Sequence, residues 1–303
     1  MPAQEPRPRE TPRSAPLTVR RALRHLLMTS RPLSWINTAY PFGAAWLLSG
    51  GGLDVRFWVG CLFFLVPYNL AMYGINDVFD YESDLRNPRK GGVEGDVLDR
   101  RMHRTVLWAS ALTCVPPAAF LLATSHVALL PVLGLSLFAV VAYSVRGLRF
   151  KEVPVLDAVT SSTHFSSPAW CALAALGIWP SAAGWCALAA FFVWGMASQA
   201  FGAVQDIGPD REAGLASVAT VLGARTTVRL SLCGHAAAGI LAAFTGPLTG
   251  WAALGAIPYL VSVARFARIT DATAARSHRG WTTFLWLNYA VGFAVTMLLI
   301  AQI

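Results

Sequence analysis

Two short acidic segments of this 303-residue chain combine residue types and spacings that could do chemistry. The first, NDVFDYESD at residues 76–84, follows the apolar run FWVGCLFFLVPYNLAMYGI. Residues four apart lie on nearly one face of a helix, so Asn76, Asp80 and Asp84 would form a polar stripe at its end. Carboxylate and amide oxygens with no His or Cys beside them suit Mg²⁺ better than zinc. The alternative is a helix end that the cytoplasm simply solvates.

The second segment, QDIGPDREAGLAS, again places two acids, Asp206 and Asp210, four residues apart after an apolar stretch. The offset is 130 residues both from Asn76 to Asp206 and from Asp80 to Asp210. An acid near the hydrocarbon costs roughly 2.5–3.5 kcal/mol on insertion scales, so a repeated pair argues for a bound cation. We predict a duplicated four-helix unit whose two copies face a common cavity, with one further helix.

The charge of these acids indicates a ligand. The Asp pairs would balance two Mg²⁺ ions, and metals held in this way commonly clamp a phosphate. A diphosphate at the mouth of an apolar cavity implies a lipid-like diphosphate, which would leave as its carbon–oxygen bond breaks. Cations that could offset its charge lie on the predicted inner loops: Arg86, Arg89, Lys90, Arg149, Lys151 and Arg211.

The elements that position these residues are predicted to be membrane helices. Hydrophobic residues make up 55% of the chain and charged residues 13%, with a mean hydropathy of +0.51, whereas soluble domains carry about 25% charged residues. Apolar stretches of roughly 20 residues are long enough to cross a bilayer. We predict an all-α polytopic membrane protein with nine transmembrane helices around a central cavity, at 32–50, 56–80, 105–124, 127–146, 154–177, 181–206, 219–244, 248–267 and 281–302.

The basic residues predict the orientation. With a cytoplasmic N-terminus, 23 of the 24 Lys and Arg residues fall on the inner side and only Arg56 falls outside, as the positive-inside rule requires. The net charge of +8 therefore reflects topology and not nucleic-acid binding. Residues 1–30 are expected to form a disordered basic tail in which LTVRRALRHLLM is an interfacial helix. Residues 31–303 would form the membrane domain.

Both acidic segments resemble known motifs. NDVFDYESD and DIGPDREAG are similar to the first and second aspartate-rich motifs of the UbiA superfamily of intramembrane prenyltransferases, and the resemblance extends over essentially the whole chain after residue 30. It implies nine transmembrane helices around a central cavity, capped on the cytoplasmic side by the loops after helices 2 and 6. It also implies a set of Mg²⁺-diphosphate ligands, with Asp77 as a further candidate: Asn76, Asp80, Asp84, Asp206 and Asp210.

A third segment, YSVRGLRFKE, resembles the loop after helix 4 of that family, where a Tyr and basic residues approach the prenyl diphosphate. The matching residues are Tyr143, Arg149 and Lys151. A Tyr face can stabilise a carbocation as it does other cations, although an aromatic residue anchoring the membrane interface would explain Tyr143 equally well. The predicted catalytic residues are therefore Asp80, Asp206, Tyr143 and Lys151.

The acceptor is predicted from two features. YESDLRNPRKGGVEGD looks most like the carotenoid branch of the family, the lycopene elongases. Quinone-forming members commonly carry an acid seven residues before the second motif, and that place here is Gln199. The expected reaction transfers a dimethylallyl group from its diphosphate to lycopene, a membrane-dissolved polyene, after which the new cation loses a proton or captures water. The alternatives are a quinone or other aromatic acceptor, and a membrane transporter.

Two polar residues inside predicted spans complete the site. His164, in the polar stretch TSSTHFSSPAW, is a candidate for proton handling along a substrate path. Asn37 is a candidate for contact with the diphosphate side of the cavity. Packing or hydrogen bonding between helices would explain both residues without a substrate.

Overall fold

The computed structural model describes residues 18–85 and 97–302, and within these ranges every regular element is helical. Five 3-10 turns connect the α-helices: η1 (Pro32–Ser34), η2 (Arg100–Met102), η3 (Phe150–Glu152), η4 (Thr249–Gly255) and η5 (Asp271–Ser277). In chain order the α-helices are α1 (Val19–Thr29), α2 (Ile36–Leu48), α3 (Val55–Leu65), α4 (Pro67–Phe79), α5 (Tyr81–Asp84), α6 (His103–Thr124), α7 (Leu129–Ser144), α8 (Leu156–Leu176), α9 (Ala182–Val204), α10 (Ile207–Glu212), α11 (Val218–Leu222), α12 (Ala224–Ala243), α13 (Ala256–Ala264) and α14 (His278–Ile300).

Each of the nine predicted membrane segments contains one or more of these helices. Among the described residues, four helical stretches are long and apolar enough to cross a membrane: Val55–Phe79, Arg100–Thr124, Ala182–Val204 and Asp271–Ile300. Two more, Leu129–Ser144 and Thr249–Ala264, are apolar but shorter. The helices α8 and α12 have 21 and 20 residues but contain many Ser, Thr, His or Arg side chains. The count of nine spans therefore stays a prediction.

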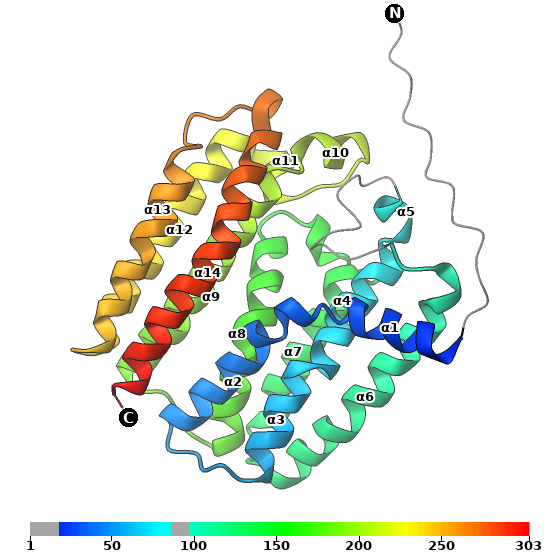
Figure 1. Cartoon of the computed structure of the whole chain (residues 1–303). Helices are drawn as coiled ribbons and strands as arrows, with labels where there is room; N and C mark the ends of the chain where they lie inside the picture. Colours follow the sequence, from blue (N-terminus) through cyan, green and yellow to red (C-terminus); the bar gives the residue numbers. More distant parts are fainter. Residues whose placement is uncertain (1–17, 86–96, 303) are drawn as a thin grey trace, which may run out of the picture.

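The helices form a bundle with two hydrophobic cores (Figure 1). One core gathers large side chains from α2 to α8, among them Trp46, Phe63 and Tyr68. The other gathers residues from α9 to η5, among them Phe201 and Val263. Because α8 contacts α2, α7 and α9, it lies between the two groups of helices. A chain built from two similar halves would produce this division, although the duplication itself stays a prediction.

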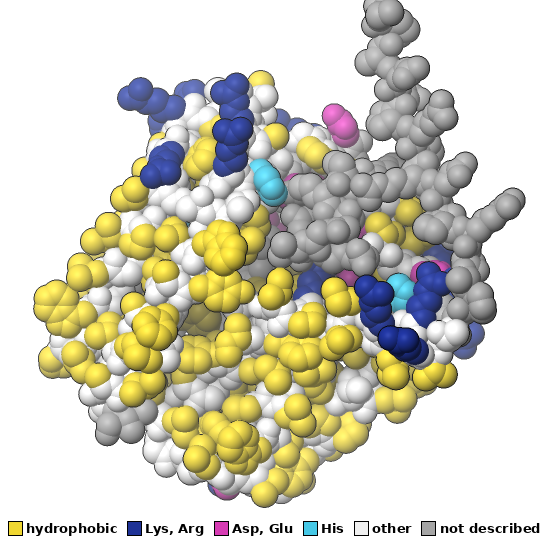
Figure 2. Space-filling model, in the orientation of Figure 1, with side chains coloured by type: hydrophobic (Ala, Val, Ile, Leu, Met, Phe, Trp, Pro, Cys, Tyr) yellow, Lys and Arg dark blue, Asp and Glu magenta, His cyan; other side chains and the backbone are white. Residues whose placement is uncertain are grey.

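The outer surface supports a membrane environment. Figure 2 shows hydrophobic side chains spread over the middle and lower parts of the visible face, while Lys and Arg gather at its upper end and right margin. Large apolar side chains such as Trp108, Leu112, Trp286 and Phe293 are between 64 and 72% exposed. In water an apolar surface of this extent would be unfavourable by about 25 cal/mol per Å², whereas lipid solvates it. The prediction of an all-α integral membrane protein is confirmed.

The segment expected to form an interfacial helix is helical, as α1, and its place at the membrane interface stays a prediction; residues 1–17 lie outside the described part of the chain. Ala22 and Leu26 of α1 and Val78 of α4 pack against a small apolar cluster of Leu98, Met102 and Val106. The residues Val19, Leu23 and Leu27 are spaced four apart and remain exposed. This apolar stripe is typical of a helix that lies at a membrane surface.

A proline interrupts the second predicted span between α3 and α4. Pro67 has no N–H, so helical hydrogen bonds fail around it and carbonyl groups of the preceding turn lose their partners. Asn69 supplies the replacement, because its Nδ2 lies 2.9 Å from the Phe64 carbonyl and 3.0 Å from the Leu65 carbonyl. Thr38 of α2 donates to the same Phe64 carbonyl at 2.6 Å and accepts from Asn69 at 2.7 Å. This buried polar cluster fixes α2 against the bend.

We expect Asn69→Ala to destabilise the protein by about 1–3 kcal/mol, because it removes the side-chain donor to the Leu65 carbonyl, one of two side-chain donors to the Phe64 carbonyl, and the donor to the Thr38 hydroxyl. The measurement is the thermal unfolding midpoint of the purified protein in detergent. Asn37→Ala is the matched control, since Asn37 is exposed on the neighbouring helix and should leave the midpoint unchanged. Equal midpoints for the two variants would contradict this account of the bend.

Candidate active site

Both acidic motifs lie where a long helix stops and a short one begins. Asp80 separates α4 from α5 with φ −99° and ψ 2°, and Asp206 separates α9 from α10 with φ −98° and ψ −2°. In each case the amide four residues later bonds back to the Asp carbonyl, from Asp84 at 2.9 Å and from Asp210 at 2.8 Å. The backbone therefore pairs Asp80 with Asp206 and Asp84 with Asp210. The offset between the motifs is 126 residues rather than the 130 expected from spacing alone.

The two motifs lie at the same end of the bundle, where α5 and α10 are found together (Figure 1). Asp80 caps the carboxyl end of α4, where the helix dipole already carries partial negative charge. A carboxylate in this position is unfavourable unless a cation accompanies it. The local geometry of the first motif therefore favours cation binding.

The cation beside the first motif is Lys151. Its Nζ forms an ion pair with Asp80 and lies 3.4 Å from Asn76 Oδ1. Ser144 at the end of α7 donates to the same Asn76 oxygen at 2.8 Å. The side chains of Asp80 and Lys151 are only 12% and 14% exposed, so the pair is largely removed from solvent. The structure thus brings together Asn76, Asp80 and Lys151, which were predicted separately from two distant segments.

Arg149 lies beside this pair. Its Nη2 is 3.7 Å from Asp80 Oδ1, and its Nε donates to Glu152 at 2.6 Å. The hydrogen bond to Glu152, with the charge of Asp80 beyond it, holds the pKa of the Arg149 guanidinium above its usual value. Arg149 adopts a φ of 41°, an uncommon conformation for a residue with a side chain. The loop between α7 and α8 therefore turns sharply to present two fixed cations to the first motif.

Tyr143 lies on α7 within electrostatic range of both motifs. The charges of Asp157, Asp80 and Asp210 all act on its side chain. Its ring meets His164 edge to face, with ring centroids 5.2 Å apart. The predicted residues Tyr143 and His164 thus lie together on facing helices, α7 and α8, beneath the acidic residues. For Tyr143 this is a position inside the bundle rather than an anchor at the membrane interface.

Asp157 is a buried acid that belongs to none of the sequence motifs. This residue is 1% exposed at the start of α8, and it accepts hydrogen bonds from the amides of Ala158 at 2.8 Å and Val218 at 3.1 Å. It therefore ties the loop that carries Lys151 to the segment that follows the second motif. An acid inside a predicted span is by itself a signal of function or structure, and that signal was present at residue 157.

Asp77 and Asn37 differ from their predicted roles. Asp77 is 2% exposed and forms an ion pair at 3.0 Å with Arg31, whose guanidinium covers the Tyr73 ring at 4.6 Å. This contact ties Asp77 to the segment between α1 and α2. Asn37 is exposed, and the buried polar residue of α2 is its neighbour Thr38. The prediction that Asn37 is a buried polar residue is wrong, because the buried face of the helix begins one residue later.

Arg211 also points away from the acidic residues. Its guanidinium donates to the Thr220 carbonyl, at 2.7 Å from Nη2, and its Nη1 lies 2.7 Å from Asp271 Oδ2. Asp271 in turn accepts from the Ala224 amide at 2.7 Å. Arg211 therefore stabilises the packing of α11 and η5, and its role in binding a diphosphate stays a prediction. The predicted residues Arg86, Arg89 and Lys90 lie outside the described residues.

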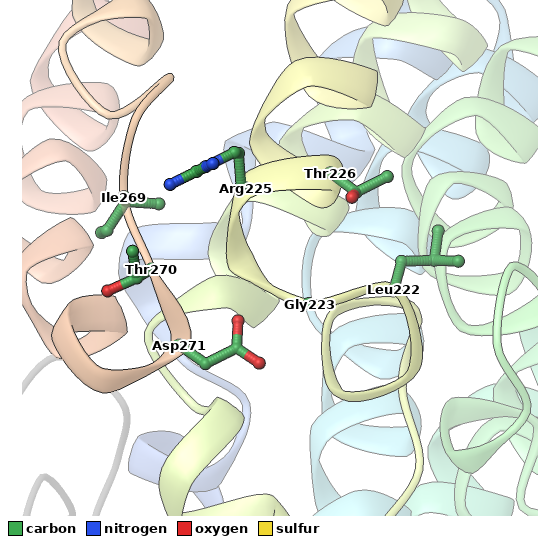
Figure 3. Close-up of a pocket in the computed structure, with 7 residues that line it drawn as sticks. All are labelled: Leu222, Gly223, Arg225, Thr226, Ile269, Thr270 and Asp271. Carbon is green, nitrogen blue, oxygen red and sulfur yellow. The ribbon is translucent and has the colours of Figure 1, made fainter.

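A surface pocket of about 310 Å³ opens next to this ion pair (Figure 3). Its lining residues come from the end of α11, the start of α12 and the chain leading into the first residue of η5, and none of them belongs to the two acidic motifs: Leu222, Gly223, Arg225, Thr226, Ile269, Thr270 and Asp271. The pocket is therefore separate from the cluster around Lys151.

The donor atoms of the two motifs fit Mg²⁺. Among the described residues, no three or more His, Cys, Asp or Glu side chains stand close enough together to hold a metal ion by themselves. The motifs instead offer hard oxygens in pairs, and Mg²⁺ is commonly held by one or two carboxylates while water and substrate phosphates complete its shell. Around Asp80, the carboxylate and the Asn76 amide oxygen already converge on the Lys151 ammonium.

The UbiA prenyltransferase family matches residues 38–297, which includes both motifs and the Lys151 loop. The chain belongs to this family. It is 55% identical over 282 residues to a lycopene elongase/hydratase of Corynebacterium glutamicum, a match that covers 92% of the chain and 97% of that relative. It is 54% identical to a C(50) beta-cyclic carotenoids biosynthesis protein, LbtBC, of a Dietzia species, over 91% of the chain and 64% of the relative.

The fold agrees with this assignment. A solved structure of a UbiA homolog from Archaeoglobus fulgidus, bound to DMAPP and Mg²⁺, superposes with a TM-score of 0.64 at 17% identity. The match covers 88% of this chain and 98% of that one. The predicted resemblance to the family is confirmed, and the transporter alternative is set aside because the chain is a UbiA-family enzyme.

For this UbiA enzyme, we expect Lys151→Met to raise the KM for the prenyl diphosphate by about tenfold or more. The variant removes a charge-assisted donor, an interaction worth about 1.5–3 kcal/mol, next to Asp80. Steady-state kinetics in isolated membranes measure the effect. Lys151→Arg keeps the charge and should recover part of the loss. An unchanged KM in Lys151→Met would exclude contact between Lys151 and the donor.

We expect Arg211→Ala and Asp271→Ala to lower the unfolding midpoint without raising the KM for the prenyl diphosphate. Both variants break the same contact between α10 and η5, so the double variant should lose less stability than the sum of the single losses. Thermal unfolding of the four proteins measures this coupling. A rise in KM for Arg211→Ala alone would restore the original prediction that Arg211 binds the substrate.

Proposed function

We propose that this UbiA enzyme transfers a dimethylallyl group from dimethylallyl diphosphate to lycopene in a Mg²⁺-dependent reaction. The observation that carries the donor half is the cluster of Asp80, Asn76 and Lys151 at the end of α4. The acceptor half rests on the 55% identity to a protein named lycopene elongase/hydratase, over nearly the full length of both chains.

The acidic residues would hold the donor at the end of the bundle. Asp80 and Asp84 from the first motif and Asp206 and Asp210 from the second would bind two Mg²⁺, with Asn76 as a further ligand. When bound, Mg²⁺ neutralises the negative charge that grows on a diphosphate leaving group. Lys151 and Arg149 would donate hydrogen bonds to the diphosphate oxygens, and charge-assisted bonds of this kind are about twice as strong as neutral ones.

The residues beneath the acids would face the organic half of the donor. As the carbon–oxygen bond breaks, positive charge develops on the allylic carbons, and the Tyr143 ring is suited to stabilise it. The terminal double bond of the acceptor would then attack the carbon that carried the diphosphate. The new carbon–carbon bond leaves a tertiary cation on the acceptor, which loses a proton or takes up water.

Gln199 supports a hydrocarbon acceptor. It accepts a hydrogen bond from Ser161 at 3.0 Å, and a neutral amide cannot remove the proton of a phenol. An alkene needs no such base before it attacks. The aromatic-acceptor alternative would need another acid near this position.

The proposed reaction would take place at the cytoplasmic surface of the cell membrane. The distribution of 23 of the 24 Lys and Arg residues supports a cytoplasmic N-terminus and a site open on that side. A soluble diphosphate could enter there, while an apolar acceptor could reach the site from the lipid.

The test is expression of the chain in a bacterial host that accumulates lycopene, with mass analysis of the extracted pigments. We expect pigments heavier by one or two five-carbon units, with or without added water, and their loss in Asp80→Asn and Asp206→Asn. Asp54→Asn is the matched control, because Asp54 caps α3 at a position where Asn caps equally well. Unchanged lycopene beside well-expressed protein would redirect the search to aromatic acceptors.

A further inference from the structure

The most unusual buried group outside the acidic motifs is the imidazole of His164. The residue is 3% exposed in the middle of α8, and its Nε2 has no hydrogen-bond partner in the described part of the chain. The ring also bonds to the backbone of Ala139 on α7. A neutral imidazole that donates from one nitrogen keeps a lone pair on the other. Nε2 is therefore an available acceptor with no structural contact to explain it.

An unpartnered nitrogen alone does not make a site, because Nε2 of His103 and His235 also lacks a partner. His164 differs in its surroundings. Its ring contacts Tyr143, which interacts with an acid of each motif. His235, in contrast, stacks on Tyr259 and bonds to the Ser231 carbonyl at 2.8 Å.

The depth of His164 also fits a role in the reaction. It lies seven residues after Asp157 on α8, which corresponds to about 10 Å along the helix axis. Ser161 lies three residues nearer the acids and bonds to Gln199 of α9. Residues three apart are neighbours on a helix surface. Along α8, the Ser161–Gln199 pair therefore lies between Asp157 at the diphosphate end and His164, which is deeper in the bundle and contacts the Tyr143 ring.

We propose that His164 is the proton acceptor of the transfer reaction, an inference that rests on the proposed function. After the acceptor's double bond attacks the donor carbon, the tertiary cation must shed one proton for charge to balance. In the elongation route, a carbon–hydrogen bond next to the cation breaks, its electron pair forms the new double bond, and Nε2 takes the proton.

In the hydration route, a water oxygen bonds to the cationic carbon and Nε2 takes a proton from that water. The Ser161–Gln199 pair offers polar groups beside which this water could bind. In both routes the products are the enlarged polyene, free diphosphate and one proton, which the imidazolium later returns to solvent. The Nε2 atom of His164 would thus accept the proton in both the elongation and the hydration route.

The test compares His164→Asn and His164→Gln with the wild-type chain. Neither amide can accept a proton as imidazole does, while Asn can still donate from a position near Nδ1. Two readouts are measured in membranes from the expressing host: release of diphosphate from dimethylallyl diphosphate without lycopene, and formation of enlarged pigment with lycopene. We expect pigment formation to fall about 100-fold or more, the usual effect of losing a general base, while diphosphate release stays within about twofold.

His235→Asn is the matched control, a second buried His with an unpartnered Nε2, and it should leave both readouts near the wild-type values. Wild-type pigment yield in His164→Asn would overturn the inference. So would a parallel loss of both readouts, because a collapsed site rather than a missing base would then be the cause. If the wild-type chain itself enlarges no lycopene, the proposed function fails and this inference falls with it.

Discussion

A carboxylate at the carboxyl end of a helix requires a cation, and the arrangement of this enzyme's site depends on that requirement. Asp80 adds a full charge where the dipole of α4 is already negative. The loop between α7 and α8 supplies the cations Lys151 and Arg149 in a sharply turned segment. Removing one partner from a pair this buried would leave the other charge less well compensated, which is costlier than the loss of a surface pair. The charged groups of Asp80, Lys151 and Arg149 therefore contribute both to the proposed donor chemistry and to local stability.

The polar character of α8 follows from its place between the two groups of helices. Its Ser and Thr side chains are buried, and several form hydrogen bonds to neighbouring helices. Ser162 donates to the Phe192 carbonyl of α9 at 2.6 Å, and the hydroxyls of Ser167 and Ser136 of α7 lie 2.7 Å apart. A lipid-facing helix could not carry so many hydroxyls at low cost, but a helix enclosed by α2, α7 and α9 can. His164 departs from this pattern, since one of its nitrogens has no such partner.

The sequence predicted what depends on local spacing. Apolar segments located the helices, and acids four residues apart located both motifs, because these patterns follow from helix geometry. It failed where a side chain's direction depends on distant contacts. Arg211 bonds to Asp271, which lies 60 residues away. Asn37 and Thr38 differ only in helix phase, which packing against the bend at Pro67 decides. The predicted pairing of residues between the two motifs was wrong by four positions. Residues four apart are equivalent in a helical stripe, and only the positions of the helix ends show which of them correspond.

The separation of charged and neutral polar groups has a consequence for acceptor choice. All described cations that contact the motifs lie at one end of the bundle, whereas the residues beneath Tyr143 are neutral: Ser161, His164 and Gln199. Binding of a diphosphate needs fixed charged side chains. A charged side chain next to a polyene would lose its hydration without gaining a hydrogen bond or an ion pair in return. Substitutions in the motifs should therefore alter every reaction of this fold alike. We expect substitutions on the facing surfaces of α8 and α9 to alter which acceptor reacts, because the neutral polar side chains of Ser161, His164 and Gln199 belong to these two helices.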